Sequence, residues 1–315
     1  MNQRNQTEIN RPAIEVTFYY GSHEFEDDAT KFQSYLDTAD IYLPEVRGWT
    51  ANALDRYTNV SNATETPDQA DQICIDNGEG RRKAFTMQLW KMLYGSNKRI
   101  VVVDIPSDFE SSYDGSKDVY ETLTDNSRSF SEFLHELNIE TDNEVANQAK
   151  REDYITERLK AFLEDTSTSN PSEEQLRVLL TIGAIHTRLF ERFVGDPALE
   201  HVTFKQVFSE TPQPYYYRAE LMKRKLYGEE VNEELLAQVF LEDIFQPHVD
   251  AFTAFTDAND EIKLLRAIIE SLSFEDAQKV FETWDDQKVA QFIAIEIMKT
   301  QGYTGDHNLF ERSTH

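Results

Sequence analysis

Short apolar runs alternate with helical patterns through the N-terminal part of the chain. Four of these runs are rich in β-branched and aromatic residues, and we expect them to form strands: Ala13–Tyr20, Ala39–Glu45, Arg99–Asp104 and Arg177–Gly183. The last two are almost continuously apolar, which is typical of strands buried on both faces. His201–Phe208 follows as a predicted edge strand.

Helical periodicity fills the segments between the strands. Phe32, Tyr35 and Leu36 share one face of the first such segment, and similar stripes precede the third and fourth strands. Strands that alternate with helices favour an α/β fold, with a mostly parallel mixed sheet flanked by helices and connected by right-handed crossovers.

The C-terminal part of the chain has a different pattern. Two prolines interrupt the segment "SETPQP", and from Tyr215 to about Thr300 one helical pattern follows another. We therefore expect an α/β domain over residues 1–212 and an all-helical domain over residues 213–315. The acidic segment Asp108–Asn147 and the Ser/Thr-rich segment Asp165–Glu174 are predicted as surface excursions.

Composition and charge narrow the classes of function. The 315 residues are 39% hydrophobic and carry a formal net charge of -27, so we expect an acidic globular protein. The negative field repels phosphates and anionic lipids, which argues against nucleic acid and membrane surfaces as partners. A small-molecule or peptide substrate is the expected partner, and the sequence predicts no particular oligomeric state.

Two further features bear on the compartment. Cys74 is the one cysteine, so the chain forms no internal disulfide and offers no cluster of thiolate ligands. The N-terminal residues lack an apolar core of signal-peptide length, and the chain has no apolar run long enough to span a bilayer. These features predict a cytoplasmic protein.

Polar residues follow the end of each predicted strand. His23 follows the first strand in a Gly-Ser-His turn, Glu45 and Asp104 end the second and third, and His186 follows the fourth in "GAIH". Ligands of open α/β sheets bind beyond the carboxyl ends of the strands. If the strands are parallel, two imidazoles and two carboxylates meet at one edge.

Each of these residues also has an ordinary structural interpretation. His23 can be a loop histidine, Glu45 a surface acid beside Arg47, and Asp104 the cap of a turn. Their occurrence together at four strand ends favours a functional site. Such a set suits a divalent Mn, Zn, Co or Fe ion, with His23, Glu45 and His186 as ligands and Asp104 as a further candidate. It equally suits metal-free acid–base chemistry, in which a Glu polarises a His that activates water.

The order of these motifs resembles the TIKI/TraB superfamily, with erythromycin-esterase-like and ChaN-like haem-binding proteins as distant relatives. The resemblance covers about Ile14 to Phe208. It rests on the Gly/His turn of "GSHEFEDD", the strand ends at Glu45 and Asp104, the helix "REDYITERL" and the second Gly-x-x-His in "VLLTIGAIHTRLF". The chain departs from the family in two places: Gly21 lies two residues before His23 instead of three, and Glu152 replaces the Asp expected after the arginine.

The resemblance implies a catalytic site made of His23, Glu45, Arg151 and His186. Arg151 would hold a substrate carboxylate or stabilise an oxyanion; the alternative is that it forms salt bridges with the surrounding acids. The function implied is hydrolysis of a peptide or ester bond, with or without a divalent metal. The competing hypothesis is a non-catalytic protein that binds haem or another ligand and acts through its acidic helical C-terminal domain.

Overall fold

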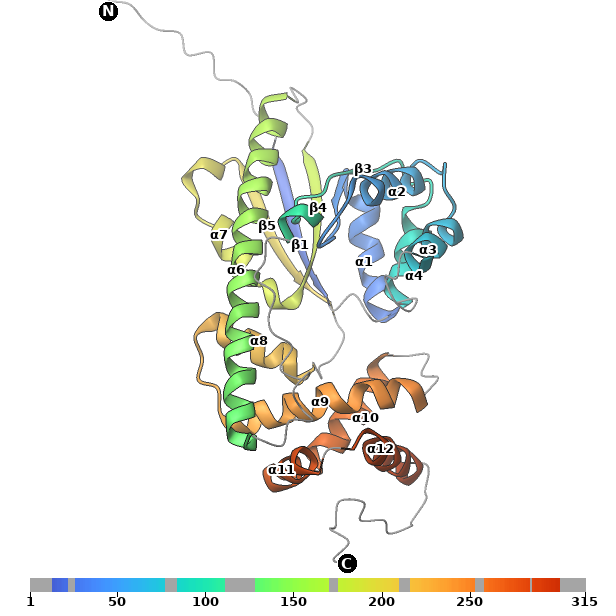
Figure 1. Ribbon diagram of the computed structural model, residues 1–315. Helices are drawn as coiled ribbons and strands as arrows, with labels where there is room; N and C mark the ends of the chain where they lie inside the picture. The colour runs from blue at the N-terminus through green and yellow to red at the C-terminus, as the bar shows by residue number, and fades with distance from the viewer. Residues whose placement is uncertain are drawn as a thin grey trace, which may run out of the picture. The chain divides into compact units, whose positions relative to one another are not determined.

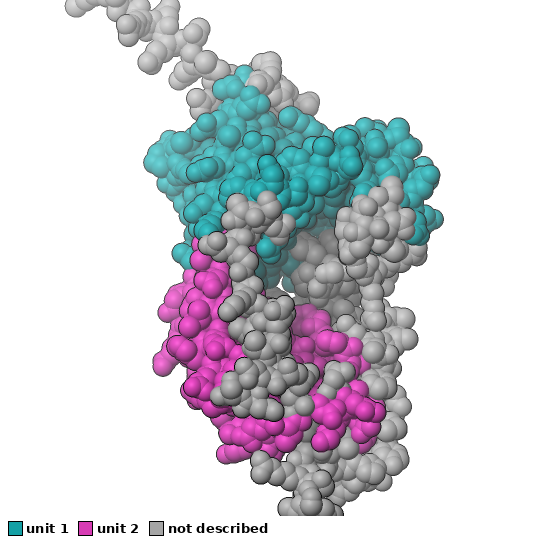
Figure 2. Space-filling view, viewed as in Figure 1, with its two compact units in different colours: residues 1–113, 150–211 teal, residues 114–149, 212–315 magenta. Residues whose placement is uncertain are grey.

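A computed structural model describes residues 13–21, 26–76, 84–110, 128–169, 175–209, 216–252, 258–283 and 285–300. The chain divides into two compact units, which Figure 2 colours separately. The first comprises residues 1–113 and 150–211, and the second comprises residues 114–149 and 212–315. The domain boundary predicted from the sequence, between residues 212 and 213, is close to the point where residues 212–315 begin. The sequence prediction assigns residues 114–149 to the first domain.

The first unit is built on a five-stranded sheet with the order β3-β2-β4-β1-β5 (Figure 1). The sequence predicts a mostly parallel sheet, and every described strand pair is parallel. The strands are β1 (Ile14–Gly21), β2 (Ile41–Leu43), β3 (Arg99–Ile100), β4 (Leu176–Gly183) and β5 (Val202–Phe208). The predicted edge strand is β5, which pairs with β1 alone.

Two strands are shorter than the sequence predicts. The strand predicted over Ala39–Glu45 is reduced to β2, because Ala39 still hydrogen-bonds to the preceding helix and Pro44 has no N–H for the ladder. The strand predicted over Arg99–Asp104 pairs only through its first two residues. β3 lies at the sheet edge beside the three-residue β2, and the ladder between them ends where the Val101 N–H donates to the Tyr42 carbonyl at 3.1 Å.

Helices cover both faces of the sheet, and most of its buried strand residues are apolar on either side. Phe32 and Leu36 of α1 and Trp90 of α4 pack with Tyr19 and Leu179 on one face. On the other face, α7 and the C-terminal half of α6 pack against strand residues that include Val16, Phe18 and Leu180. The helices of this unit are α1 (Glu26–Thr38), α2 (Ala51–Ser61), α3 (Pro67–Asp76), α4 (Ala84–Leu93), α5 (Ser107–Glu110) and α7 (Arg188–Phe193), with the 3-10 turns η2 (Ala184–His186) and η3 (Pro197–Leu199).

The long helix α6 (Phe130–Ser169) contains residues of both units. The sequence predicts a surface excursion over Asp108–Asn147, and this prediction is wrong from Phe130 onward. Phe130, Phe133 and Leu134 of α6 are buried in the core of the helical unit. Apolar side chains at helical spacing decide the structure of this segment, despite the many acids between them.

The second unit is helical throughout its described residues. Its core is formed by the N-terminal part of α6 and the C-terminal helices, with Phe240, Phe245 and Phe281 among the buried side chains. These helices are α8 (Tyr217–Tyr227), α9 (Glu233–Phe252), α10 (Ala258–Glu270), α11 (Phe274–Glu282) and α12 (Asp286–Thr300). No helix in the described part of the chain combines the length and apolarity needed to cross a bilayer.

A buried acid caps α8 from a neighbouring helix. Tyr216, at the N-cap position, makes no side-chain capping bond. Instead, the Glu242 carboxylate of α9 accepts backbone N–H bonds from Tyr217 at 2.6 Å and Arg218 at 2.9 Å. Burial raises the pKa of Glu242 to about 7, although the two N–H groups and Arg218 act in the opposite direction.

We predict that this acid makes the helical unit less stable as pH rises. The pKa of Glu242 is higher in the folded chain than its ordinary value of 4.5, so the folded state holds the proton more tightly between these values. Raising the pH from about 5.5 to about 8 should cost about 2 kcal/mol through this group. Urea unfolding of wild type and Glu242→Gln at both pH values measures the difference.

Glu234→Gln is the matched control, because Glu234 is an exposed acid on the same helix. It should keep the pH dependence of the wild type, whereas Glu242→Gln should flatten it. Equal pH dependence in wild type and Glu242→Gln would show that Glu242 titrates alike in the folded and unfolded chains.

Candidate active site

Four of the predicted site residues meet beyond the carboxyl ends of the strands. Glu45 follows β2, and Asp104 lies in the segment between β3 and α5. Arg151 belongs to α6, and His186 is the last residue of η2, which follows β4 directly. All four belong to the first unit. Because the strands are parallel, their carboxyl ends bring residues distant in the sequence to one edge. His23 lies outside the described residues.

Arg151 is the centre of this cluster. Its Nε donates to Asp104 Oδ1 at 2.8 Å, and its Nη2 donates to Asp104 Oδ2 at 2.6 Å, which makes a bidentate pair. Nη2 also donates to Glu45 Oε1 at 2.7 Å. Burial by itself lowers the pKa of Arg151, but the carboxylates of Glu45 and Asp104 more than offset this, and the net pKa is raised. The guanidinium is therefore a fixed cation.

His186 is held from both sides of its ring. Arg151 Nη1 lies 3.2 Å from His186 Nε2, and Glu152 Oε1 lies 3.2 Å from Nδ1. A guanidinium can only donate, so Nε2 accepts and the ring proton is on Nδ1, from which it is donated to Glu152. The side chains of His186 and Glu152 are each only 1% exposed. His186 is thus oriented by two charged groups.

Glu45 is the member of the cluster with the most access to solvent. Its side chain is 19% exposed, compared with 6% for Arg151 and 3% for Asp104. Glu45 Oε2 accepts the backbone N–H of Gly183 at 2.6 Å, and Glu45 Oε1 lies 3.7 Å from His186 Nε2. A Cβ added at Gly183 would lie 3.5 Å from Glu45 Oε2, which is an ordinary van der Waals contact. The site therefore needs the backbone N–H of this residue and does not need the absence of a side chain.

Four supporting residues, Glu152 among them, are not in the set of site residues that the sequence predicts. Trp49 Nε1 donates to the Asp104 carbonyl at 2.7 Å, and the Thr181 hydroxyl accepts the Glu45 backbone N–H at 3.3 Å. Arg192 of α7 contacts Glu152 Oε2 at 3.3 Å. Glu152 itself was noted only as a departure from a family motif. Its place directly after Arg151 is the signal that the sequence offers, whereas Trp49, Thr181 and Arg192 reach the site only through the tertiary fold.

The described donors do not fit a metal ion. Both Asp104 oxygens and His186 Nε2 face the Arg151 guanidinium, and a cation in that place repels a metal cation. No group of three or more His, Cys, Asp and Glu side chains within the described ranges could hold a metal. Of the predicted ligands His23, Glu45, His186 and Asp104, the first lies outside these ranges. The arrangement also matches the salt-bridge interpretation of Arg151.

We predict that Arg151→Met destabilises the α/β unit by about 3–5 kcal/mol, because it leaves the Asp104 and Glu45 carboxylates without their buried cation. Urea unfolding measures the change. Arg158→Met is the control, since Arg158 lies exposed on the same helix, and it should change stability by less than about 0.5 kcal/mol. Equal, small losses in the two variants would contradict the assigned role of Arg151.

The His186 tautomer can be observed directly. In protein labelled with ¹⁵N-histidine, we expect long-range ¹H–¹⁵N spectra to show the His186 proton on Nδ1 and none on Nε2. His186→Asn identifies the signal by its disappearance, and His135→Asn should leave it in place. A proton found on Nε2 would be incompatible with the contact to Arg151.

Comparison with known proteins finds no relative of this chain. No family model, no curated protein and no solved structure matches the chain. The resemblance to the TIKI/TraB superfamily therefore stays a prediction that rests on the order of the motifs.

Proposed function

We propose that the protein is a hydrolase that cleaves an ester or peptide bond at the Glu45 site. The observation that carries this proposal is the convergence of Glu45, Asp104 and His186 on the Arg151 guanidinium. Arranging several buried charges around one partly exposed carboxylate costs solvation free energy. Active sites are where such arrangements of charge concentrate.

Glu45 is the group we assign to the chemistry. Its carboxylate takes a proton from a water molecule, the water oxygen attacks the substrate carbonyl carbon, and the proton passes to the leaving group as the bond breaks. The Arg151 cation and the Gly183 N–H hold this carboxylate in one place. A base that is already oriented avoids the entropy cost of positioning it during the reaction.

Arg151 and His186 act as positioning residues in this proposal. Each nitrogen of the Arg151 guanidinium already donates within the cluster, and both ring nitrogens of His186 are engaged. Their burial also keeps them from a substrate in solution. Of the two roles that the sequence leaves open for Arg151, this proposal uses the salt bridges with acids and not direct binding of the substrate. No step is assigned to a metal ion.

We predict that Glu45→Gln lowers kcat/KM by about 100-fold or more, because the amide keeps the shape but cannot accept a proton. Release of p-nitrophenol from a panel of acyl esters, together with mass spectrometry of a peptide mixture, measures activity. Glu157→Gln, which changes an exposed acid on α6, should retain wild-type activity. Thermal unfolding of each variant separates lost chemistry from lost structure.

Two results would count against the proposal. The first is a folded Glu45→Gln protein with wild-type activity, and the second is a wild-type protein that cleaves none of the substrates. Stoichiometric haem binding in the absence of hydrolysis would support the ligand-binding alternative.

A further inference from the structure

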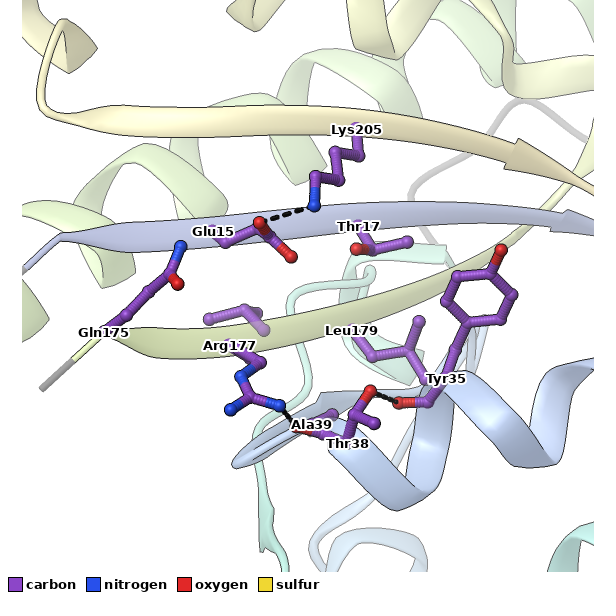
Figure 3. Close-up of a pocket in the computed structure, with 10 residues that line it drawn as sticks. Glu15, Thr17, Tyr35, Thr38, Ala39, Gln175, Arg177, Leu179 and Lys205 are labelled. Carbon is purple, nitrogen blue, oxygen red and sulfur yellow. Dashed lines mark hydrogen bonds and ion pairs between the residues drawn. The ribbon is translucent and has the colours of Figure 1, made fainter.

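A hollow of about 340 Å³ opens on the face of the sheet that α1 covers in part. It lies over the amino-terminal halves of β1 and β4, with β5 and the end of α1 at its sides (Figure 3). Glu15, Thr17, Arg177 and Lys205 project into it from the strands. Its volume is within the lower part of the range of small-molecule sites.

The sequence of β1 shows that this hollow departs from ordinary sheet packing. β1 has a strand on each side, and such strands in parallel sheets are apolar on both faces. Ile14, Val16 and Phe18 follow this rule on one face. On the other face, Glu15 and Thr17 take the place of apolar residues and line the hollow.

The hollow has more positively charged side chains than negatively charged ones. Lys205 Nζ pairs with Glu15 Oε2 at 2.6 Å. Arg177 is the direct strand neighbour of Glu15, yet it forms no ion pair among the described residues. The Arg177 side chain is exposed, and its Nη1 donates to the Thr38 carbonyl at 3.3 Å. Asp40 accepts the backbone N–H of Arg177, not its side chain.

The hollow therefore combines two cations with one carboxylate in a chain whose net charge is -27. An oxygen anion is the ligand that a guanidinium recognises best, because two of its N–H groups can donate to it in parallel. Leu179 and the ring of Tyr35 give the hollow apolar surface, while Thr17 and Gln175 offer hydroxyl and amide groups. These surroundings suit a small organic molecule with both polar and apolar parts.

We propose that this hollow binds a small organic anion, whose carboxylate or phosphate group pairs with Arg177 while Lys205 contributes a second positive charge. The site is separate from the proposed active site. Gly183 lies six positions after Arg177 in β4, and this corresponds to about 20 Å along a strand. Neither site depends on the other, so the failure of one leaves the other standing.

Titration calorimetry of the full chain with inorganic phosphate and with succinate tests the proposal and distinguishes the two anion classes. We expect saturable binding of at least one of them, weakened about tenfold or more in Arg177→Gln. Thr17→Leu should weaken binding as well, because its added carbons occupy the hollow while the charges remain. The signal of the Arg177 Nε–H group in ¹H–¹⁵N spectra should shift during the titration.

Arg158→Gln is the matched control, since it removes the same charge from an exposed position outside the hollow. It should leave the affinity unchanged. If Arg158→Gln and Arg177→Gln weaken the anion affinity equally, the effect comes from the overall charge of the protein, and the proposal is overturned. The absence of saturation by either anion up to about 10 mM would overturn it too.

Discussion

The arrangement of side chains at the carboxyl edge of the sheet depends on the hydrogen bonds and ion pairs of the Arg151 guanidinium. The guanidinium binds Asp104 through two nitrogens, shares one of these with Glu45 and reaches His186 with the third. One side chain of α6 thus joins the ends of three other segments of the chain. A lysine could not do this, because its single ammonium lacks the planar fork that matches a carboxylate and leaves further donors for other partners.

In the hydrolase that we propose, this arrangement separates the residues that position from the residue that reacts. The buried members of the cluster, Asp104, Arg151, Glu152 and His186, bind one another. Glu45 belongs to the same network but retains partial access to solvent. Buried ion pairs stabilise a protein only weakly, because their desolvation offsets their attraction. In the proposed hydrolase, their role is to hold Glu45 in one geometry from which its carboxylate activates water.

The two faces of the sheet show how helix coverage decides where function can develop. The face under α6 and α7 is closed by apolar side chains, including Phe18 and Phe193. On the opposite face, coverage by α1 leaves polar residues of β1 and β5 beside a hollow. Polar groups on an interior strand of a parallel sheet are rare because they interrupt apolar packing. Their presence there marks a surface that packing alone does not explain.

The sequence by itself determined where the strands lie, their alternation with helices and a mostly parallel sheet, because these follow from local periodicity and from the chirality of crossovers. The lengths of β2 and β3 depend on how these strands pair. It also placed Glu45, Asp104 and His186 at one edge, since the carboxyl ends of parallel strands coincide. Only the tertiary structure decided that Arg151 stands between them and engages the groups expected to bind a metal. The same holds for the assignment of Phe130 to the helical core, because burial depends on residues far away in the chain.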